Sequence, residues 1–331
     1  MSIRCPNAKR ARMKVSLILA TKDRSQETDR FIRSLADQDY GDFELIVVDQ
    51  NEDDRLQGIL AESQIRSRIT YLKSEPGLSH ARNVGIASAT GDIVGFPDDD
   101  CWYPDGLLAR VVSEFESHPW VAGFTGRSED GQGRASGGSF SRFRDRVDIG
   151  NVWNKGISYT IFLRSLVCAA VGPFDEELGV GARTRFSSGE ETDYLIRAVK
   201  LGFNIQYLAD LVVFHPNPIL YNRNHRRKAF RYGAGMGRVL SKHRYNLFFS
   251  LYSIFRPFAG ALLSLLMLRP RKAAYHLAIA GGRASGLWPL AGTGGLEPEA
   301  SLHLSSRRHA CVAAPPRKRH YKEFRKNDYE A

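Results

Sequence analysis

The chain has 331 residues, of which 43% are hydrophobic and 25% are charged, and its formal net charge is +11. This length accommodates one large α/β domain with an appendage. The four cysteines are far apart and form no CxxC pair, which argues against a disulfide framework or a zinc site and favours a reducing compartment. The N-terminus is polar and basic without an apolar stretch, so we expect no signal peptide.

The positive charge is concentrated in the last third of the chain. Residues 221–331 hold 21 Lys and Arg against 5 Asp and Glu, whereas residues 1–220 hold 26 against 31. This asymmetry predicts an anionic partner surface, either a membrane or nucleic acid.

The N-terminal part alternates between short apolar runs and segments of helical periodicity. The expected strands cover residues 15–20, 43–48, 68–72 and 92–96, and the expected helices cover residues 31–38 and 79–89, the second with Ser79 as its N-cap. Strands that alternate with helices at this spacing predict a parallel, doubly wound sheet. In such sheets, ligands bind beyond the carboxyl ends of the strands.

Polar clusters follow three of these strands at their carboxyl ends. They are Thr21-Lys22-Asp23, Asp49-Gln50 and Asp98-Asp99-Asp100. Because the carboxyl ends of parallel strands lie at one edge of the sheet, we expect the three clusters to converge there.

The acid triplet Asp98-Asp99-Asp100 is the most informative of these clusters. Three adjacent carboxylates repel one another unless a positive group joins them, and a divalent cation with hard oxygen ligands is the usual solution. The alternative is a solvated acidic turn that caps the following helix.

The turn after the first strand, residues 20–24, contains no glycine, and the chain has no P-loop. Both absences argue against a dinucleotide-binding fold, whose glycine-rich fingerprint follows the first strand. Any bound phosphate must then be neutralised by a metal and basic side chains.

The second half of the chain is less regular. We expect a long loop over residues 123–150, strand character over 157–171, a helix from Gly189 to Leu201, strands over 204–208 and 211–215, a basic helix over 221–243, an apolar segment over 247–268 that is broken at Arg256-Pro257, and disorder over 291–331.

Five short blocks occur in order along the chain: Val15-Ser16-Leu17-Ile18, Phe43-Glu44-Leu45-Ile46-Val47-Val48-Asp49, Gly77-Leu78-Ser79-His80-Ala81-Arg82-Asn83-Val84-Gly85, Phe96-Pro97-Asp98-Asp99-Asp100 and Gly189-Glu190-Glu191-Thr192-Asp193. Together they resemble family 2 glycosyltransferases of the GT-A fold. The resemblance covers roughly residues 14–220. It implies a Rossmann-like, mostly parallel sheet with flanking helices and the transfer of a sugar, with inversion, from a nucleotide-sugar donor.

The resemblance also implies that the acid triplet is a DxD-type motif, which would hold Mn²⁺ or Mg²⁺ against the donor diphosphate. Asp98 would face the ribose or the metal, and Asp99 or Asp100 would be a direct ligand. The register of the triplet stays open at this point, because a strand alternates its faces. His215 would be a further metal ligand or diphosphate contact, although a histidine at a strand end is often structural.

An inverting reaction needs a carboxylate that deprotonates the acceptor hydroxyl. The resemblance places this base in the pair Glu190-Glu191, and Glu191 is our candidate, although the family has aspartate at that position. Asp193 is the second candidate. Alternatively, these acids only complement the positive end of a helix, and Asp193 forms an ordinary pair with Arg197.

Further residues match positions at which the family contacts the nucleotide. Asp49 and Gln50 stand where many relatives read the base with two aspartates, so that only the first of the two matches. Thr21, Asp23 and Arg82 complete the predicted nucleotide-binding set.

The C-terminal region suits a membrane surface. Residues 247–268 have the length of a membrane span, but Arg256 near the middle makes spanning costly. Basic residues flank the segment on both sides, as an interfacial anchor on an anionic leaflet requires. We therefore favour monotopic attachment over a true span or a helical subdomain. Binding to nucleic acid is the weaker interpretation, since no recognition motif accompanies the basic tail.

We accordingly divide the chain into an N-terminal tail (1–13), a GT-A domain (14–220), a basic and apolar helical membrane-associating region (221–290) and a basic tail (291–331). The predicted function is metal-dependent, inverting sugar transfer to a glycan or lipid-linked acceptor in cell-surface polysaccharide synthesis, at the cytoplasmic face of the membrane. The alternatives are a sugar nucleotidyltransferase and a non-catalytic membrane-bound protein that binds glycan or nucleic acid.

Overall fold

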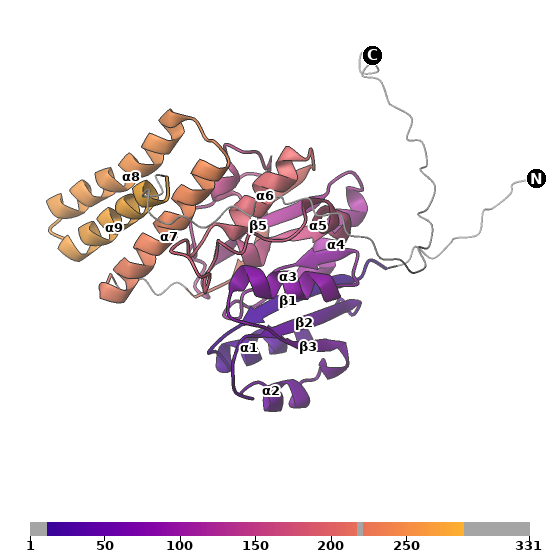
Figure 1. Ribbon diagram of the computed structural model, residues 1–331. Coiled ribbons are helices and arrows are strands. Elements are labelled where there is room, and N and C mark those ends of the chain that lie inside the picture. The colour runs from indigo at the N-terminus through magenta and orange to yellow at the C-terminus, as the bar shows by residue number, and fades with distance from the viewer. Residues whose placement is uncertain (1–11, 217–220, 288–331) are drawn as a thin grey trace, which may run out of the picture. The chain divides into compact units, whose positions relative to one another are not determined.

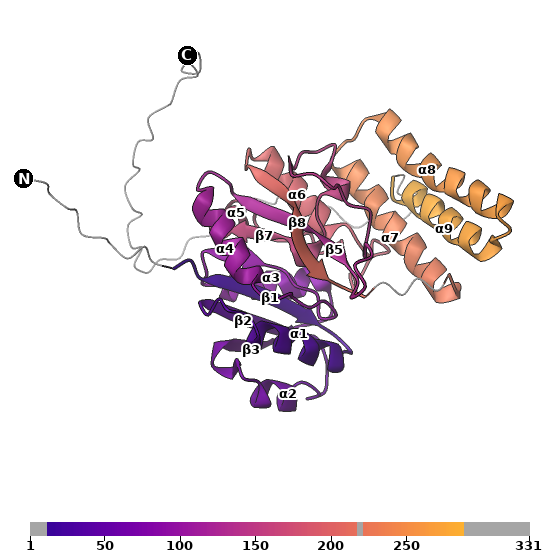
Figure 2. The same ribbon diagram turned by 180° about the vertical axis from the view of Figure 1, so that it is seen from behind.

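The computed structural model describes residues 12–216 and 221–287, with a central sheet that helices cover on both faces (Figures 1 and 2). The strands are β1 (Val15–Thr21), β2 (Phe43–Asp49), β3 (Ile69–Lys73), β4 (Ile93–Gly95), β5 (Gly123–Glu129), β6 (Asp145–Arg146), β7 (Phe162–Arg164) and β8 (Ile205–Phe214). The helices are α1 (Gln26–Ala36), α2 (Gln57–Glu62), α3 (Leu78–Ser88), α4 (Leu107–Ser117), α5 (Ser165–Val171), α6 (Glu190–Lys200), α7 (Arg223–Lys242), α8 (Leu247–Leu266) and α9 (Pro270–Leu287). The predicted tail over residues 1–13 lies almost entirely outside the described residues, and so does the predicted disorder over 291–331.

The eight strands form one sheet in the order β3-β2-β1-β4-β7-β5-β8-β6. Strand β1 pairs in parallel with β2 and β4, β2 with β3, and β5 with β8. Strand β7 is antiparallel to β4 and β5, and β6 is antiparallel to β8. The prediction of a mixed α/β fold with a mostly parallel sheet is confirmed.

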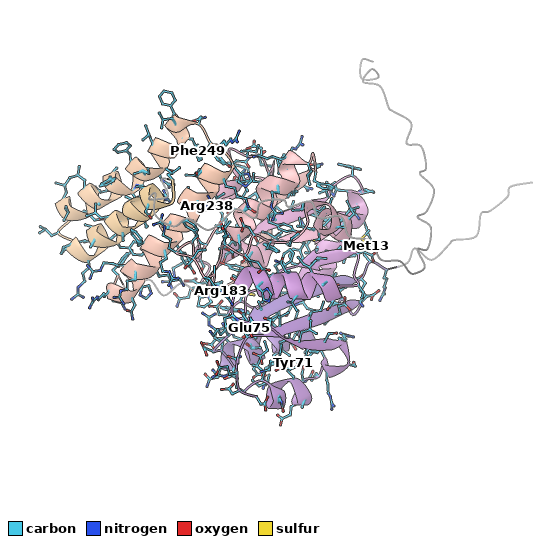
Figure 3. All side chains as sticks on the ribbon, in the orientation of Figure 1. Met13, Tyr71, Glu75, Arg183, Arg238 and Phe249 are labelled. Carbon is cyan, nitrogen blue, oxygen red and sulfur yellow. The ribbon has the colours of Figure 1, made fainter. Side chains whose placement is uncertain are left out.

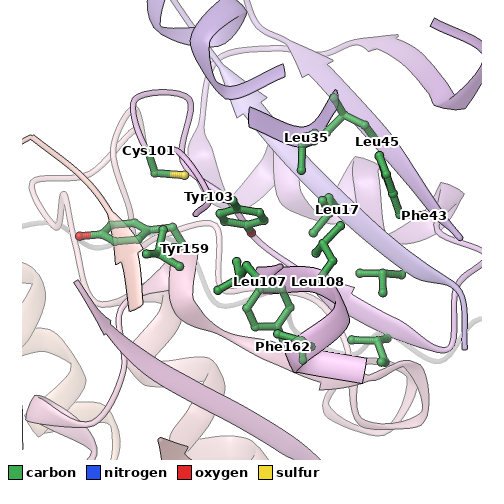
Figure 4. Packing of buried hydrophobic residues seen from close by; sticks show 14 of the residues in the cluster. Leu17, Leu35, Phe43, Leu45, Cys101, Tyr103, Leu107, Leu108, Tyr159 and Phe162 are labelled. Carbon is green, nitrogen blue, oxygen red and sulfur yellow. The ribbon is translucent and has the colours of Figure 1, made fainter. Parts of the chain in front are cut away.

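The core has two layers because side chains alternate along each strand. Leu17 and Leu19 of β1 pack in a cluster with residues of α1 and α4, whereas Ile18 and Ala20 pack on the other face with residues of α3 and α6. Figure 4 shows part of the first cluster, with Leu17, Leu35, Phe43, Leu45, Leu107, Leu108 and Phe162. Each fully buried Leu or Phe contributes about 1.5 to 3 kcal/mol relative to an exposed one, so these layers hold the carboxyl ends of the strands in place.

The prediction of a long loop over residues 123–150 is wrong for its first part, which forms strand β5. The glycines that suggested a loop serve close packing instead. A Cβ atom on Gly126 would lie 2.2 Å from the carbonyl oxygen of Leu211 in β8, and one on Gly123 would lie 2.5 Å from Leu163 of β7. Glycine in a strand often marks such close backbone approach.

Three other local predictions are corrected by the structure. Residues 157–171 were expected to be strand, but they contain strand β7 and then helix α5. The prediction failed for α5 because a short buried apolar run does not distinguish helix from strand. The two strands expected over 204–215 are one strand, β8, with an irregularity in its pairing to β5. Helix α3 begins at Leu78 with Gly77 as its N-cap, and Ser79 instead donates a hydrogen bond to the carbonyl of Leu178.

Helix α8 continues through Arg256-Pro257, the pair that interrupts the apolar run in the sequence. Proline removes the hydrogen bond to the carbonyl four residues earlier, which belongs to Ser253. Arg283 of α9 donates a hydrogen bond to that carbonyl from its guanidinium. The neighbouring helix therefore satisfies the group that Pro257 leaves free, and the helix persists.

Helices α7 and α9 pack backbone against backbone through glycines. A Cβ atom on Gly237 would lie 2.2 Å from the carbonyl oxygen of Arg283, and one on Gly282 would lie 2.1 Å from that of Phe230. Such small-residue contacts are typical of closely approaching helices. Helix α9, which we did not predict as a separate element, is therefore bound firmly to α7.

Candidate active site

A cluster of potential metal ligands lies beyond the carboxyl ends of β4 and β8. One ligand atom each of Asp98, Asp100 and His215 lies within 4.8 Å of the others. Asp98 follows β4 and forms a parallel bridge to Ala20 of β1, whereas His215 directly follows β8. The topology thus brings together residues that are more than a third of the chain apart.

The imidazole of His215 is oriented for ligation. Its ring stacks on Tyr159, with centroids 4.7 Å apart, and its Nδ1 lies 2.6 Å from the carbonyl oxygen of Pro216. A carbonyl only accepts hydrogen bonds, so Nδ1 carries the proton and Nε2 faces Asp100 at 2.9 Å. Burial acts to lower the pKa of His215, but the hydrogen bond to Asp100 outweighs it and raises the pKa.

Asp98 is joined to the glutamate pair by a buried arginine. Arg82, which is 1% exposed, donates to Asp98 Oδ1 and to Glu190 Oε1, each at 3.0 Å. Ser158 also donates to Asp98 Oδ1, at 3.1 Å, and the guanidinium of Arg82 lies over the ring of Phe174. Burial raises the pKa of Asp98, and the charge of Arg82 opposes this rise. One side chain thus fixes the distance between the metal-ligand cluster and α6.

Asp99 is separated from this cluster and is held by Arg24. The guanidinium of Arg24 lies 2.6 Å from Asp99 Oδ1 and 2.5 Å from Asp100 Oδ2. Burial raises the pKa of Asp99 to about 6 in spite of Arg24. For Asp100, burial is outweighed by His215 and Arg24, and its pKa falls to about 2. Of the three acids, Asp98 and Asp100 face His215, and Asp99 does not belong to the group.

Glu191 lies at the start of α6 and lines a small pocket. The other lining residues are Arg82, Phe96, Ser158, Ile161, Phe174 and Tyr194. Burial and the adjacent charge of Glu190 raise the pKa of Glu191 to about 8. A carboxylate with a pKa close to the operating pH is suited to general-base catalysis.

Asp193 has a different environment from Glu191. It is fully buried, and its oxygens lie 2.9 Å from Arg197 Nε, 2.8 Å from Lys242 Nζ and 2.8 Å from His243 Nε2. Burial is outweighed by these partners, so that its pKa falls to about 2. With both oxygens engaged by cations or potential cations, Asp193 is poorly placed to take a proton from a substrate, and its catalytic role stays a prediction that the geometry does not favour.

Asp49 ends β2 and is fully buried beneath the rim of the sheet. It accepts hydrogen bonds from Asn51 and from the hydroxyl of Tyr71, and Lys73 Nζ lies 3.1 Å away. Burial acts to raise the pKa of Asp49, but these hydrogen bonds outweigh it and lower the pKa. The carboxylate is therefore ionised and rigidly oriented.

The other predicted nucleotide-binding residues occupy the same edge. Gln50 accepts a hydrogen bond from the backbone N–H of Gly77, and Thr21 is 1% exposed at the end of β1. Asp23 is exposed, has a positive φ of 60°, and is held by a hydrogen bond from its backbone N–H to Asn51 Oδ1. Of these three side chains, only that of Asp23 is exposed to solvent. Thr21 and Gln50 are buried and shape the rim from below.

Three residues of the site were not predicted from the sequence. Arg24 stands in the turn after the first strand, where its position at a strand end was an available signal. Ser158 and Tyr159 come from a short 3₁₀ helix between β6 and β7, in a segment for which the sequence predicted strand. Only the folded chain brings these two residues to the acid cluster.

The donor set fits a divalent cation. Two carboxylates and one imidazole are ligands that a divalent cation accepts. The proton on Nδ1 of His215 is held by a carbonyl, which is the usual support for a ligating histidine. The residues that would hold the ion are Asp98, Asp100 and His215.

Comparison with known proteins gives a consistent result. The model of the family described as glycosyl transferase family 2 matches residues 16–167. Glycosyltransferase AglE of Haloferax volcanii is 26% identical over 274 residues, which cover 79% of this chain and 83% of that protein. A GalNAc(5)-diNAcBac-PP-undecaprenol beta-1,3-glucosyltransferase of Campylobacter jejuni is 30% identical over 105 residues, 30% of this chain and 34% of that protein.

Among solved structures, the chain is similar to the mannosyltransferase PcManGT from Pyrobaculum calidifontis, which was determined in complex with GDP-Man and Mn²⁺. The TM-score is 0.60 at 17% identity, covering 84% of this chain and 88% of that one, so the likeness concerns the fold. The chain spans 34%, 35% and 23% of the length of the first three curated relatives that it matches.

Proposed function

We propose that the chain, whose residues 16–167 match the model of glycosyl transferase family 2, is an inverting, metal-dependent glycosyltransferase that uses a nucleotide-sugar donor. The observation that carries the proposal is the link through Arg82. Its guanidinium contacts Asp98 of the metal-ligand group through one nitrogen and Glu190 through the other, and Glu191, the neighbour of Glu190, has a raised pKa. Donor activation and proton removal are the two tasks of such a transfer.

The donor would lie along the rim formed by the ends of β1, β2 and β4. Asp23 would contact the nucleoside, the buried Asp49, Gln50 and Thr21 would support the rim beneath it, and Asp98, Asp100 and His215 would hold Mn²⁺ or Mg²⁺. When bound, the ion would offset the charge that develops on the departing diphosphate. Arg24, which already neutralises two of the acids, would be close enough to share its charge with the phosphates.

Glu191 would act as the general base. The acceptor hydroxyl oxygen forms the new bond to the anomeric carbon, the bond from that carbon to the diphosphate oxygen breaks, and the hydroxyl proton passes to a carboxylate oxygen of Glu191. The raised pKa is consistent with this role, because the ionised form of Glu191 is a stronger base than an ordinary carboxylate. Glu190, held by Arg82, would orient its neighbour.

The acceptor would be a glycan or a lipid-linked saccharide. The Campylobacter relative is named for an undecaprenol-linked acceptor, which supports a lipid-linked class. We assign residues 14–220 to catalysis and residues 221–290 to membrane association, at the cytoplasmic face of the membrane.

Helix α8 supports attachment to a membrane surface. Among the described residues, α8 is the one helix that is long and apolar enough to cross a membrane, with a mean hydropathy of 1.4. About a third of its apolar stretch is buried in the protein. One stripe of α8 is exposed and apolar: Phe248, Tyr252, Phe255, Leu262 and Leu266. Arg256 is also exposed, at mid-helix, which favours a helix lying in the interface, where its charge can reach water, over a spanning one.

Incubation of the purified protein with a panel of nucleotide sugars and Mn²⁺ tests the function. We expect donor hydrolysis or transfer that stops with EDTA. Asp100→Ala should weaken donor binding and abolish transfer, whereas Glu191→Gln should abolish transfer and leave donor binding intact. If no nucleotide sugar binds and EDTA has no effect, the proposal is wrong.

A further inference from the structure

Lys242 near the C-terminal end of α7 connects two aspartates that are distant in sequence. Its Nζ lies 2.6 Å from Asp175 Oδ2 and 2.8 Å from Asp193 Oδ1. Asp175 follows α5, and Asp193 lies in the first turn of α6. One ammonium group therefore joins the two ends of the segment 175–193.

The segment closed by Lys242 carries the glutamate pair. Glu190 and Glu191 lie three and two residues before Asp193, in the same helical turn. Arg82 fixes Glu190 from the side of the metal-ligand cluster, at 3.0 Å. Lys242 fixes the same helical turn through Asp193, at 2.8 Å.

Further contacts of α7 run along the segment. Arg238, labelled in Figure 3, lies 3.0 Å from Glu177, and Ser188 donates a hydrogen bond to the carbonyl of Tyr232 at 2.8 Å. A Cβ atom on Gly235 would lie 2.2 Å from the carbonyl oxygen of Ser188. The backbones touch here, so α7 cannot approach further, and the ion pairs prevent its withdrawal.

Neutralisation of Asp193 alone does not require Lys242. Arg197 on α6 already provides a guanidinium at 2.9 Å in the usual i,i+4 arrangement. Lys242 adds a second positive charge at 2.8 Å and at the same time binds Asp175. Lys242 therefore adds more positive charge than the neutralisation of Asp193 needs. Its two contacts are suited to holding the segment 175–193 in position against α7.

We propose that Lys242 is a positioning residue for the Glu190-Glu191 pair, and that α7 is the support against which this pair is held. The proposal rests on the proposed function in assigning Glu191 as the base. Helix α7 also packs backbone against backbone with α9. Helix α9 in turn contacts α8 through Arg283, and α8 carries the exposed apolar stripe.

The test compares Lys242→Met, Lys242→Arg and a control, Arg227→Met, in the full chain. Arg227 is exposed on the same helix, so its replacement removes the same charge without touching the segment. The measurements are kcat and donor KM for transfer, binding of a nucleoside diphosphate with Mn²⁺, and hydrogen exchange over residues 175–193. Asp175→Asn, which removes the more exposed of the two contacts, is a second variant that should fold even where Lys242→Met does not.

We expect Lys242→Met to lower kcat by about 10- to 100-fold, as displacements of about 1 Å do, with donor KM and nucleotide binding within about twofold of the wild type. Exchange over 175–193 should rise, Lys242→Arg should restore most of the rate, and Asp175→Asn should show a smaller effect of the same kind. The control should match the wild type.

The inference is overturned if Lys242→Met keeps its kcat, if kcat and nucleotide binding fall together, or if exchange over 175–193 is unchanged. If the wild type turns over no nucleotide sugar, the proposed function fails, and hydrogen exchange still decides whether Lys242 holds the segment.

Discussion

Replacing Arg82 by Met removes the link between the two halves of the site. Its guanidinium is the ion-pair partner of both Asp98 and Glu190, and it is 1% exposed. Removing one partner of a buried ion pair typically costs about 3 to 5 kcal/mol, because an uncompensated charge remains. We expect the free energy of unfolding at pH 7.5 to fall by about this amount.

The loss of unfolding free energy caused by Arg82→Met should be smaller at low pH than at high pH. Burial already raises the pKa of Asp98 while Arg82 opposes the rise, so Arg82→Met raises the pKa further. A carboxyl whose pKa is higher in the folded than in the unfolded state contributes stability at low pH and loses it as the pH rises through the folded value. The destabilisation should therefore be smaller at pH 5 than at pH 7.5.

Urea unfolding followed by circular dichroism at the two pH values measures the effect, with exposed Arg227→Met as the control. Arg82→Lys keeps the charge but lacks the planar fork of donors with which Arg82 contacts the two carboxylates from two different nitrogens, so its loss of unfolding free energy should be intermediate. A loss below about 1 kcal/mol for Arg82→Met, or an equal loss at both pH values, would refute the reasoning.

Four other outcomes are expected. The kcat for transfer should rise with pH toward about 8, the pKa of Glu191, and at pH 6 should be about one hundredth of its plateau; a flat profile between pH 6 and 9 contradicts this role. His215→Ala should weaken Mn²⁺ binding in the presence of a nucleoside diphosphate by about tenfold or more, measured by calorimetry, and an unchanged affinity removes His215 from the ligand set. Leu262→Glu should reduce flotation with anionic vesicles by about tenfold, whereas equal flotation would exclude α8 as the contact. Arg283→Met should cost about 1 to 3 kcal/mol of unfolding free energy, and clearly less in a Pro257→Ala background, where no carbonyl is left free; equal costs in both backgrounds would show that Arg283 does not act through Pro257.

The sequence was sufficient to predict strands β1 to β4 and the edge of the sheet at which their polar clusters lie. Buried runs ending in polar residues placed Asp49 and Asp98 at strand ends, and the structure brings these ends to one rim. The sequence did not predict the elements in which a residue type common in loops serves close packing instead. Gly123 and Gly126 are loop formers by propensity, but here they allow strands to approach closely.

The partners of each side chain could not be predicted, because they depend on long-range contacts. Arg82 was expected at the nucleotide, yet it bridges residues 16 positions and 108 positions away in the chain. The partners of Asp193 on α7 are about 50 positions away. A helical i,i+4 pair with Arg197 was visible in the sequence, but the attachment to α7 was not.

The acid triplet shows how the fold assigns different tasks to identical residues. Asp99 and Asp100 lie in a turn that is closed by a hydrogen bond from the backbone N–H of Cys101 to the carbonyl of Asp98, and the bridge between Asp98 and Ala20 fixes where this turn begins. Asp98 and Asp100 accordingly face His215, whereas Asp99 turns to Arg24. The pKa values follow the same division, about 2 for Asp100 and about 6 for Asp99. An ion in this site would therefore meet an ionised Asp100, while Asp99, paired with Arg24, holds the turn that presents the other two.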